Sequence, residues 1–399
     1  MNPPVFVAGL GVVSAIGLDA AACLHSFETE EAGMADIKIL HTRQRGKLPV
    51  AEVKLSNEAL AELTGLSSGM PRTALLSALA AREALADAGI FNFKDLRAGF
   101  ISANTVGGMD KTEDFFESFM MNAAAGKLRD VVYHECGSIT EIVADHLGIN
   151  HFISTVSTAC SSSANAVFTG ARMIRHGLLD LALVGGADAL TRFTLNGFNT
   201  LMILDKSFCK PFDEHRQGLN LGEGAGYLVL VSEEIMNRLN KSAYCRIAGY
   251  SNANDAYHQT ASSPGGTGSF LAMKNALENS GLVPGDIDYI NLHGTGTNNN
   301  DIAEGTAIKL LFDPVYPKMS STKSFTGHTL GASGGMEAVF SALAIRHGII
   351  YPNLRFETPM KELPFTPVTK FLNHQRVKHV ISNSFGFGGN CTSLVFSAS

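Results

Sequence analysis

Ile153-Ser154-Thr155-Val156-Ser157-Thr158-Ala159-Cys160-Ser161-Ser162-Ser163-Ala164-Asn165-Ala166 contains two patterns of secondary structure in one short stretch. Residues 153–156 are rich in β-branched side chains, which favour a strand. From Ala164 to Ile174, Ala, Val, Phe and Met recur at helical spacing. The stretch therefore predicts a strand, a turn of small residues and a helix, with Cys160 in the turn.

Cys160 has two interpretations at this position. At the N-terminus of a helix, free N–H groups and the helix dipole favour a thiolate, and small neighbours leave backbone amides free to approach a substrate oxygen. Both effects are typical of a nucleophile in acyl transfer. Cysteine is also a common buried core residue, and this stretch alone does not separate the two interpretations.

On both sides of this stretch, short apolar strands alternate with longer helical patterns, which predicts an α/β layered fold. The expected strands are 5–13, 98–103, 153–156, 181–186, 227–231, 289–292 and 380–384. The expected helices are 71–88, 135–147, 164–176, 269–280, 301–311 and 334–347. Residues 249–268, rich in Gly, Ser, Asn and Pro, are predicted to join an N-terminal half, 1–249, to a C-terminal half, 250–399.

The composition is that of an ordinary globular protein, with 399 residues and 45% hydrophobic content, enough for a large core. The six cysteines lack CxxC or His-pair spacing, so neither a disulfide framework nor a zinc site is predicted, and a reducing cytoplasm fits best. No membrane span is expected, and the N-terminus lacks the basic region of a signal peptide. The net charge of −6 argues against broad nucleic-acid binding. Gly9 and Gly11 match the first two glycines of the dinucleotide-binding motif GxGxxG, but the third glycine is missing. A Rossmann fold is therefore not expected.

Two later segments contain histidines. His293 ends the expected strand 289–292 and precedes the turn Gly294-Thr295-Gly296-Thr297, a position that suits a cleft but also a core histidine. Residues 320–337 contain Lys323, His328 and Glu337 among side chains too small and polar for a core element. Such a segment indicates a functional loop.

A third segment, Asn383-Ser384-Phe385-Gly386-Phe387-Gly388-Gly389-Asn390, is a glycine-rich turn after a strand. It can offer backbone N–H groups and an aromatic wall. A plain chain reversal would not need both Phe385 and Phe387.

Together these four segments resemble the condensing enzymes of the thiolase superfamily, specifically the elongating β-ketoacyl-acyl-carrier-protein synthases of types I and II, with type II the nearer. His328 after Gly327 favours this branch over the Cys-His-Asn initiating branch, and no cysteine matches the second cysteine of biosynthetic thiolases. The resemblance covers nearly the whole chain. It includes Gly185-Gly186-Ala187-Asp188, Pro211-Phe212-Asp213, Gly218, Gly222-Glu223-Gly224-Ala225-Gly226 and Asp255-Ala256-Tyr257-His258.

The resemblance implies a five-layered αβαβα sandwich of two similar halves, with Cys160 in the first and both histidines in the second. Cys160 would take an acyl chain from a carrier-protein thioester, with the amides of Cys160 and Phe387 as oxyanion hole. Malonyl carrier protein would then lose carbon dioxide, giving an enolate held by N–H donors of His293 and His328. That enolate would attack the acyl thioester and lengthen the chain by two carbons, with no metal or organic cofactor.

The resemblance also implies supporting roles. Lys323 and Glu337 match a pair that orders the loop around His328, although simple loop anchoring would explain them too. Thr295 and Thr297 match hydroxyls that line the pantetheine tunnel.

Aromatic and β-branched residues are expected around the acyl chain. Phe387 matches the gate of the acyl pocket, and Phe385 is expected beside it in the substrate site. Val106 and Phe198 fall at pocket positions, although such residues are often plain core. Glu223 is expected to be structural.

The chain departs from the family pattern in two places. After Gly389 the family usually has Thr-Asn, whereas Asn390-Cys391 stands here, which is expected to alter packing behind the gate loop. The segment 33–68 looks shorter and less basic than usual, although carrier proteins are acidic and dock on basic patches. The basic residues in roughly the expected docking regions are Arg72, Lys127 and Arg129.

The leading hypothesis is therefore a condensing enzyme of fatty acid, polyketide or polyene synthesis that takes acyl and malonyl carrier proteins as partners. The alternative is a non-condensing, synthase-like subunit that sets chain length or decarboxylates malonyl groups in a heterodimer. Such subunits characteristically lack the cysteine, so Cys160 favours the enzyme. A cysteine hydrolase fits two enolate-stabilising histidines poorly. A homodimer is expected, and a heterodimer with a synthase-like subunit is the other arrangement.

Overall fold

The computed structural model describes residues 3–399, whose strands form one ten-stranded mixed sheet. Along the sheet the order is β3-β2-β4-β5-β1-β6-β10-β9-β7-β8. The strands are β1 (Val5–Ser14), β2 (Ala98–Ala103), β3 (Phe152–Val156), β4 (Leu181–Asp188), β5 (Gly224–Ser232), β6 (Cys245–Asn254), β7 (Tyr289–Asn291), β8 (Lys318–Ser320), β9 (His379–Phe385) and β10 (Asn390–Ser397).

The sheet consists of two five-stranded units with the same topology. In the first unit, β2 pairs in parallel with β3 and β4, and β5 runs antiparallel to β4 and β1. In the second unit, β7 pairs in parallel with β8 and β9, and β10 runs antiparallel to β9 and β6. The short pairing of β1 with β6 joins the units. The predicted division after Gly249 falls inside β6, whereas the topology divides the chain just before Cys245.

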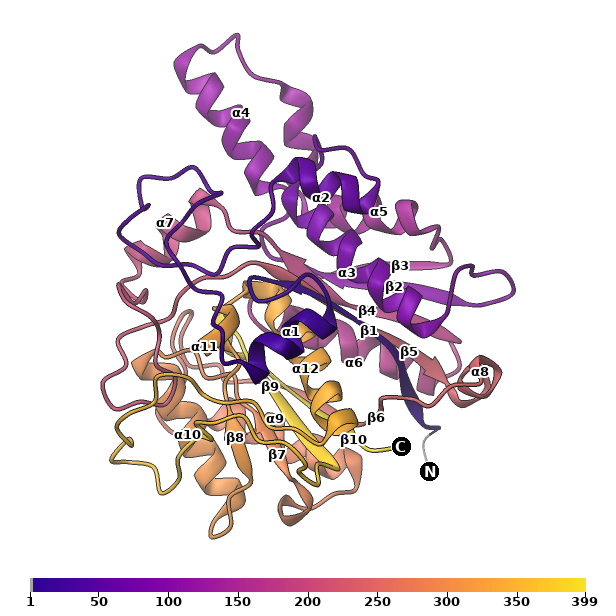
Figure 1. Cartoon of the computed structure of the whole chain (residues 1–399), viewed down its shortest axis with the longest axis vertical. Helices are drawn as coiled ribbons and strands as arrows, with labels where there is room; N and C mark the ends of the chain where they lie inside the picture. The colour runs from indigo at the N-terminus through magenta and orange to yellow at the C-terminus, as the bar shows by residue number, and fades with distance from the viewer. Residues whose placement is uncertain (1–2) are drawn as a thin grey trace.

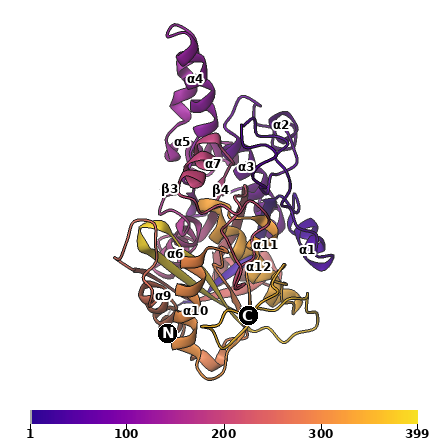
Figure 2. The same cartoon turned by 90° about the vertical axis from the view of Figure 1, so that its left-hand side faces the viewer.

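Helices pack on both outer faces and between the units, which gives the expected five-layered αβαβα arrangement (Figures 1 and 2). Helix α3 covers the outer face of the first unit, and α9 with α10 covers that of the second. Helices α6 and α12 lie between the units and contact strands of both. The helices are α1 (Ala20–Glu28), α2 (Asn57–Thr64), α3 (Arg72–Ala88), α4 (Met109–Met121), α5 (Cys136–Leu147), α6 (Ser162–Arg175), α7 (Arg192–Thr200), α8 (Glu233–Leu239), α9 (Thr267–Ser280), α10 (Asn298–Phe312), α11 (Lys323–Thr326) and α12 (Ser333–His347).

The sequence of α12 explains its central position. Its residues from Ser333 to Ile345 are all buried, as expected for a helix that is apolar or small on every side. Glycines allow the backbone of α12 to approach strand β5 closely. A Cβ built on Gly335 would lie 2.5 Å from the carbonyl oxygen of Gly226, and one on Gly226 would lie 2.4 Å from the nitrogen of Met336.

Helix α4 projects from the body of the molecule together with the 3₁₀ turn Leu128–Tyr133 (Figures 1 and 2). None of its residues is buried, although it contains Phe116, Phe119, Met120 and Met121, each at least 41% exposed. At one end of the sheet, β3 has an unpaired edge. Within residues 3–399, no helix is both long and apolar enough to pass through a membrane.

Candidate active site

Cys160 lies where the sequence predicted it, in the turn between β3 and α6. Ala159, just before it, has a φ of 54°, and the Ser162 hydroxyl accepts the backbone N–H of Thr158 at 2.7 Å. A positive φ is uncommon for alanine and makes the turn sharp. The turn buries Cys160 to 6% exposure at the start of the central helix α6.

The surroundings of Cys160 act on the pKa of its thiol in opposite directions. Burial raises its pKa to about 11, while the N–H groups of Phe387 and of Cys160 itself and the charge of Lys323 act in the opposite direction. In the resting protein, desolvation therefore outweighs the N–H groups that were expected to favour a thiolate. The two N–H groups are the pair expected to form an oxyanion hole, and both act on the sulfur.

The hydrogen bonds of His328 fix the tautomer of its ring. The backbone N–H of Leu330 donates to its Nδ1 at 3.0 Å, and the Ser333 hydroxyl lies 3.2 Å from the same atom. A ring nitrogen that accepts an N–H carries no proton, so the hydrogen of the neutral ring is on Nε2. Burial and the charge of Lys323 lower the pKa of His328 well below 6.5, which keeps the ring neutral.

The tautomer of His293 is fixed in the same way, but the donor is the Lys323 side chain. The ammonium of Lys323 lies 3.3 Å from its Nδ1, which leaves the ring hydrogen on Nε2. Burial, Lys323 and His328 lower the pKa of His293 well below 6.5.

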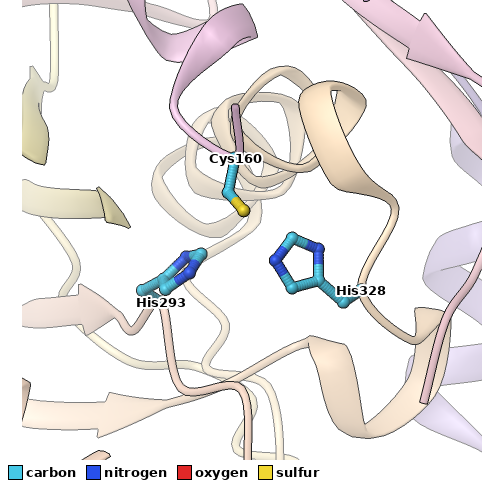
Figure 3. A group of neighbouring side chains, drawn as sticks. All are labelled: Cys160, His293 and His328. Carbon is cyan, nitrogen blue, oxygen red and sulfur yellow. The ribbon is translucent and has the colours of Figure 1, made fainter. Parts of the chain in front are cut away.

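The three side chains converge on one point. The sulfur of Cys160 and one ring nitrogen from each of His293 and His328 all lie within 4.8 Å of one another. Figure 3 shows the sulfur directed toward the two rings, which come from loops of the second unit. The rings are perpendicular, at 88°, with centroids 5.4 Å apart. Two neutral N–H donors thus face a small space beside a thiol.

This Cys-His-His group has the composition of a metal site but not its hydrogen bonding. A histidine that binds a metal normally donates its other ring N–H to an acceptor. Here the second nitrogens of His293 and His328 accept hydrogen bonds instead, so the nitrogens nearest the sulfur are already protonated. The chemistry of the donor set does not fit a metal ion.

Lys323 and Glu337 form a buried ion pair beneath the histidines, at 1% and 3% exposure. Burial raises the pKa of Glu337 to about 7, opposed by the charge of Lys323 and its hydrogen bond. Because Lys323 also contacts His293, the pair holds the ring of His293.

A cavity of about 240 Å³ leads from the thiol to the surface. Its walls include Phe198, Phe385 and Phe387, with the rings of Phe198 and Phe387 stacked at 5.8 Å and 12°. Thr295 and Thr297 also line it, and their hydroxyls lie 2.9 Å apart. The Thr297 hydroxyl also caps α10.

Val106 is placed differently from the prediction. It is buried in an apolar cluster with Leu190, Leu195 and Leu330, against which Phe198 packs. The cavity wall contains Phe198 but not Val106. Val106 therefore supports the pocket from behind, because the larger Phe198 ring fills the space that faces the thiol.

Two models of the same family match the chain. "Beta-ketoacyl synthase, N-terminal domain" matches residues 3–235, and "Beta-ketoacyl synthase, C-terminal domain" matches residues 244–357. The chain belongs to the β-ketoacyl synthase family.

Curated relatives in this family are similar over most of the chain. A 3-oxoacyl-[acyl-carrier-protein] synthase 2 of Staphylococcus aureus strain COL is 32% identical, covering 99% of this chain and 98% of the relative. The protein of the same name from Rhizobium meliloti strain 1021 is 35% identical, covering 79% of this chain and 78% of the relative. The resemblance to the elongating branch is thereby confirmed.

Solved structures in the family have the same fold. The ishigamide ketosynthase/chain length factor matches with a TM-score of 0.95 at 29% identity, covering 100% of both chains. A chain of the complex of the ketosynthase ApeO with its chain length factor ApeC, from Xenorhabdus doucetiae, matches with a TM-score of 0.85 at 29% identity, covering 100% of this chain and 98% of the other.

Buried carboxylates that the sequence reasoning missed hold the catalytic loops in this β-ketoacyl synthase. Glu304 accepts the backbone N–H groups of His293 and Gly294, and Asp301 accepts those of Thr295 and Gly296. Burial raises the pKa of Glu304 to about 7. The sequence signal was two acidic residues three positions apart, Asp301 and Glu304, just after the turn Gly294–Thr297.

A third carboxylate, Asp188, joins the two units. It accepts the N–H groups of Thr105, Val106 and Gly331, and Gly331 lies three residues beyond His328. Burial raises its pKa to about 6. Asp188 belongs to the family segment Gly185–Asp188, but its role as an acceptor for the loop after His328 was not predicted.

The basic residues expected to meet a carrier protein divide into two groups. Arg72 is 6% exposed and makes two hydrogen bonds to Glu223, at 2.9 and 2.7 Å, so it cannot meet a partner at the surface. Glu223 also accepts the N–H groups of Val53 and Leu190, in keeping with a structural role. Lys127 and Arg129 are exposed, beside α4.

Proposed function

We propose that this protein catalyses the decarboxylative condensation of an acyl group on Cys160 with a malonyl thioester, in fatty acid or polyketide synthesis. The observation that carries the proposal is the convergence of the Cys160 sulfur and the ring nitrogens of His293 and His328 within 4.8 Å. The proposed roles follow from the hydrogen that each group carries.

In the first half-reaction, Cys160 attacks the thioester carbonyl of an acyl carrier protein. The developing oxyanion is stabilised by the N–H groups of Cys160 and Phe387, which already act on the sulfur. The carrier's thiolate leaves and takes up the proton that the cysteine loses. The acyl chain remains as a thioester on Cys160, beside Phe198 and Phe387.

In the second half-reaction, a malonyl thioester occupies the cavity near the two histidines. Its C–COO⁻ bond breaks, carbon dioxide leaves, and the electron pair forms an enolate. The Nε2–H groups of His293 and His328 donate to the enolate oxygen. The enolate carbon attacks the acyl carbonyl, a C–C bond forms, and the Cys160 sulfur leaves and is reprotonated.

The tautomers argue against a cysteine hydrolase. After acylation of the cysteine, a hydrolase needs a base that takes a proton from the attacking water. Both ring nitrogens near Cys160 carry hydrogens instead, because Leu330 and Lys323 occupy the accepting nitrogens. The arrangement suits donation to an oxyanion.

We propose acyl and malonyl carrier proteins as the substrate partners and a second synthase-like subunit as the structural partner. Two of the similar solved structures are described as a ketosynthase with a chain length factor. In this chain the edge of β3 and the exposed apolar residues of α4 offer a surface for such a subunit, either a second copy or a related chain. We retain a cytoplasmic location as a prediction.

The test is covalent acylation followed by condensation. The purified protein is incubated with acyl carrier proteins of graded chain length and then with malonyl carrier protein, and intact-mass spectrometry follows the enzyme and the carrier products. Acylation that is lost in Cys160→Ala, followed by a product two carbons longer, is the expected result. Malonyl decarboxylation without acylation would support the alternative of a non-condensing subunit and would overturn the proposal.

A further inference from the structure

Asn390 occupies a junction between the gate loop and the nucleophile turn. Its side-chain oxygen, Oδ1, accepts three hydrogen bonds, from the Ser161 hydroxyl at 2.7 Å, Asn165 Nδ2 at 2.9 Å and Asn252 Nδ2 at 2.7 Å. Ser161 is the residue next to Cys160, and Asn165 is in the first turns of α6. One oxygen therefore connects the start of β10 both to Ser161, next to Cys160, and to helix α6.

The backbone of Asn390 closes the loop that contains Phe387. The N–H of Gly386 donates to the carbonyl oxygen of Asn390 at 2.8 Å, so residues 386–390 form a closed turn. At its other end this turn rests on the nucleophile, since a Cβ built on Gly386 would lie 3.1 Å from the nitrogen of Cys160. Phe387, which lines the cavity together with Cys160, lies inside this turn, and its backbone N–H lowers the pKa of the thiol.

The surrounding hydrogen bonds leave little freedom. Asn165 Nδ2 also donates to the Thr158 hydroxyl at 2.8 Å, and Asn165 Oδ1 accepts the Thr392 hydroxyl at 2.6 Å. The Ser161 hydroxyl also contacts the carbonyl oxygen of Thr158 at 2.8 Å. Hydrogen bonds to Asn390 and Thr392 thus fix both sides of the turn that contains Cys160 to strand β10.

We infer that Asn390 is a positioning residue that sets the distance between the Phe387 N–H and the Cys160 sulfur, and thereby supports acyl transfer to Cys160. It touches neither the sulfur nor the cavity wall, so it acts through Ser161 and the gate turn. The inference rests on the proposed function for its substrate, an acyl thioester. It predicts a selective effect, because acylation uses the Phe387 N–H whereas decarboxylation uses His293 and His328.

Three variants test this role. Asn390→Ala removes the acceptor, Asn390→Asp retains an acceptor oxygen, and Ser161→Ala removes one of the three bonds from the nucleophile side. Asn373→Ala, at an exposed asparagine, is the matched control. Thermal unfolding first establishes that each variant is folded.

Two half-reactions are then compared in each folded variant. We expect Asn390→Ala to slow acylation of Cys160 by about ten- to a hundredfold, less than complete loss of an oxyanion donor, with the main effect on the rate constant and little on KM. Malonyl-thioester decarboxylation should change much less, and Asn390→Asp should retain most of the acylation rate. Equal loss in both half-reactions, or unchanged acylation in Asn390→Ala, would overturn the inference. If Asn390→Ala does not fold, the two half-reactions are compared in Ser161→Ala instead. We then expect a smaller loss of acylation, again with little change in decarboxylation.

Alkylation of Cys160 by iodoacetamide separates this inference from the proposed function. The reaction needs no condensing activity, and its rate follows the thiolate population. The Phe387 N–H lowers the pKa of the thiol, so its displacement in Asn390→Ala should slow alkylation at pH 9 relative to the wild type. A wild type that neither acylates nor decarboxylates would refute the proposed function, while the alkylation rates would still decide the role of Asn390.

Discussion

The ammonium of Lys323 lies 3.3 Å from Nδ1 of His293, and it is this contact that fixes the ring hydrogen of His293 on the nitrogen facing the site. The same ammonium is the ion-pair partner of Glu337. One buried charge therefore holds the ring of His293 in its tautomer and pairs with a carboxylate on the central helix.

Replacement of Lys323 by methionine should separate these two roles. Lys323→Met leaves Glu337 buried without its cation, a change that typically costs about 3 to 5 kcal/mol of stability. The double variant Lys323→Met/Glu337→Met should recover much of that stability but not malonyl decarboxylation, because His293 still lacks its donor. Chemical denaturation and a decarboxylation assay measure the two quantities. If the double variant regained both its stability and malonyl decarboxylation, Lys323 would not be what fixes the tautomer of His293.

His328 should be replaced better by glutamine than by alanine. The glutamine amide offers an N–H donor in place of Nε2–H, whereas alanine offers none. Loss of one preorganised donor typically costs about 10²- to 10³-fold in rate, so His328→Ala should lose that much decarboxylation and His328→Gln distinctly less. The two variants are compared under saturating malonyl thioester. A general-base role for the ring predicts instead that both variants are equally inactive.

The histidines should make the protein less stable at acid pH. The pKa values of His293 and His328 in the folded protein are well below 6.5, whereas in the unfolded chain they return to about 6.5. As pH falls below 6.5, the unfolded state therefore binds more protons, and the free energy of unfolding declines. Between pH 6.5 and 5, His328→Gln should lose less of that free energy than the wild type. Equal losses in urea titrations would show that the ring titrates normally in the folded protein.

The Phe198 ring should control which acyl chains enter. Stacked aromatic pairs contribute about 0.5 to 1.5 kcal/mol beyond burial, so Phe198→Ala frees the Phe387 ring and enlarges the cavity. The rate of Cys160 acylation with long acyl thioesters should rise relative to the rate with short ones. Phe91→Ala, at a phenylalanine that is 81% exposed elsewhere on the surface, is the control. An unchanged chain-length profile would place the selective contact elsewhere.

We expect the exposed apolar face of α4 to be buried against a second subunit in the functional oligomer. Phe116→Ser/Met120→Ser removes large apolar side chains that are 57% and 67% exposed, so the fold itself should be unaffected. If a second copy covers this face, light scattering should find a wild-type dimer and a largely monomeric double variant. A wild type that is monomeric in isolation would point to a different synthase-like chain as the partner. A double variant that stays dimeric would exclude α4 from the interface.

The sequence predicted the parts of the fold whose patterns are local. The strand 98–103 and the helices around Ala164 and Gly334 lie where apolar periodicity placed them. Strand β6 was not predicted, because its second half, Ser251–Asn254, is mostly polar and is typical of a loop. It is a strand because β10 supplies its hydrogen-bond partners, and that pairing is not visible in periodicity. Helix α4 was missed for a related reason, since its apolar residues face outward rather than toward a core.

The site was predicted through the family resemblance more than through local chemistry. The segments alone left Cys160 and His293 equally consistent with core residues. The strong desolvation of Cys160 was not predicted, because the burial of this side chain is visible only once the chain is folded. Glu304 and Asp301 were missed because a carboxylate's role as an acceptor for a loop is defined only when that loop folds back on it.

The central position of α12 has a consequence for synthesis on the ribosome. The strands of the first unit are complete by Ser232, but the helix that covers the inner face of β5 begins only at Ser333. At about 5 to 20 residues per second, roughly 5 to 20 s of translation separate the two. During that interval an apolar sheet face is exposed on the nascent chain, which is the kind of surface that chaperones bind.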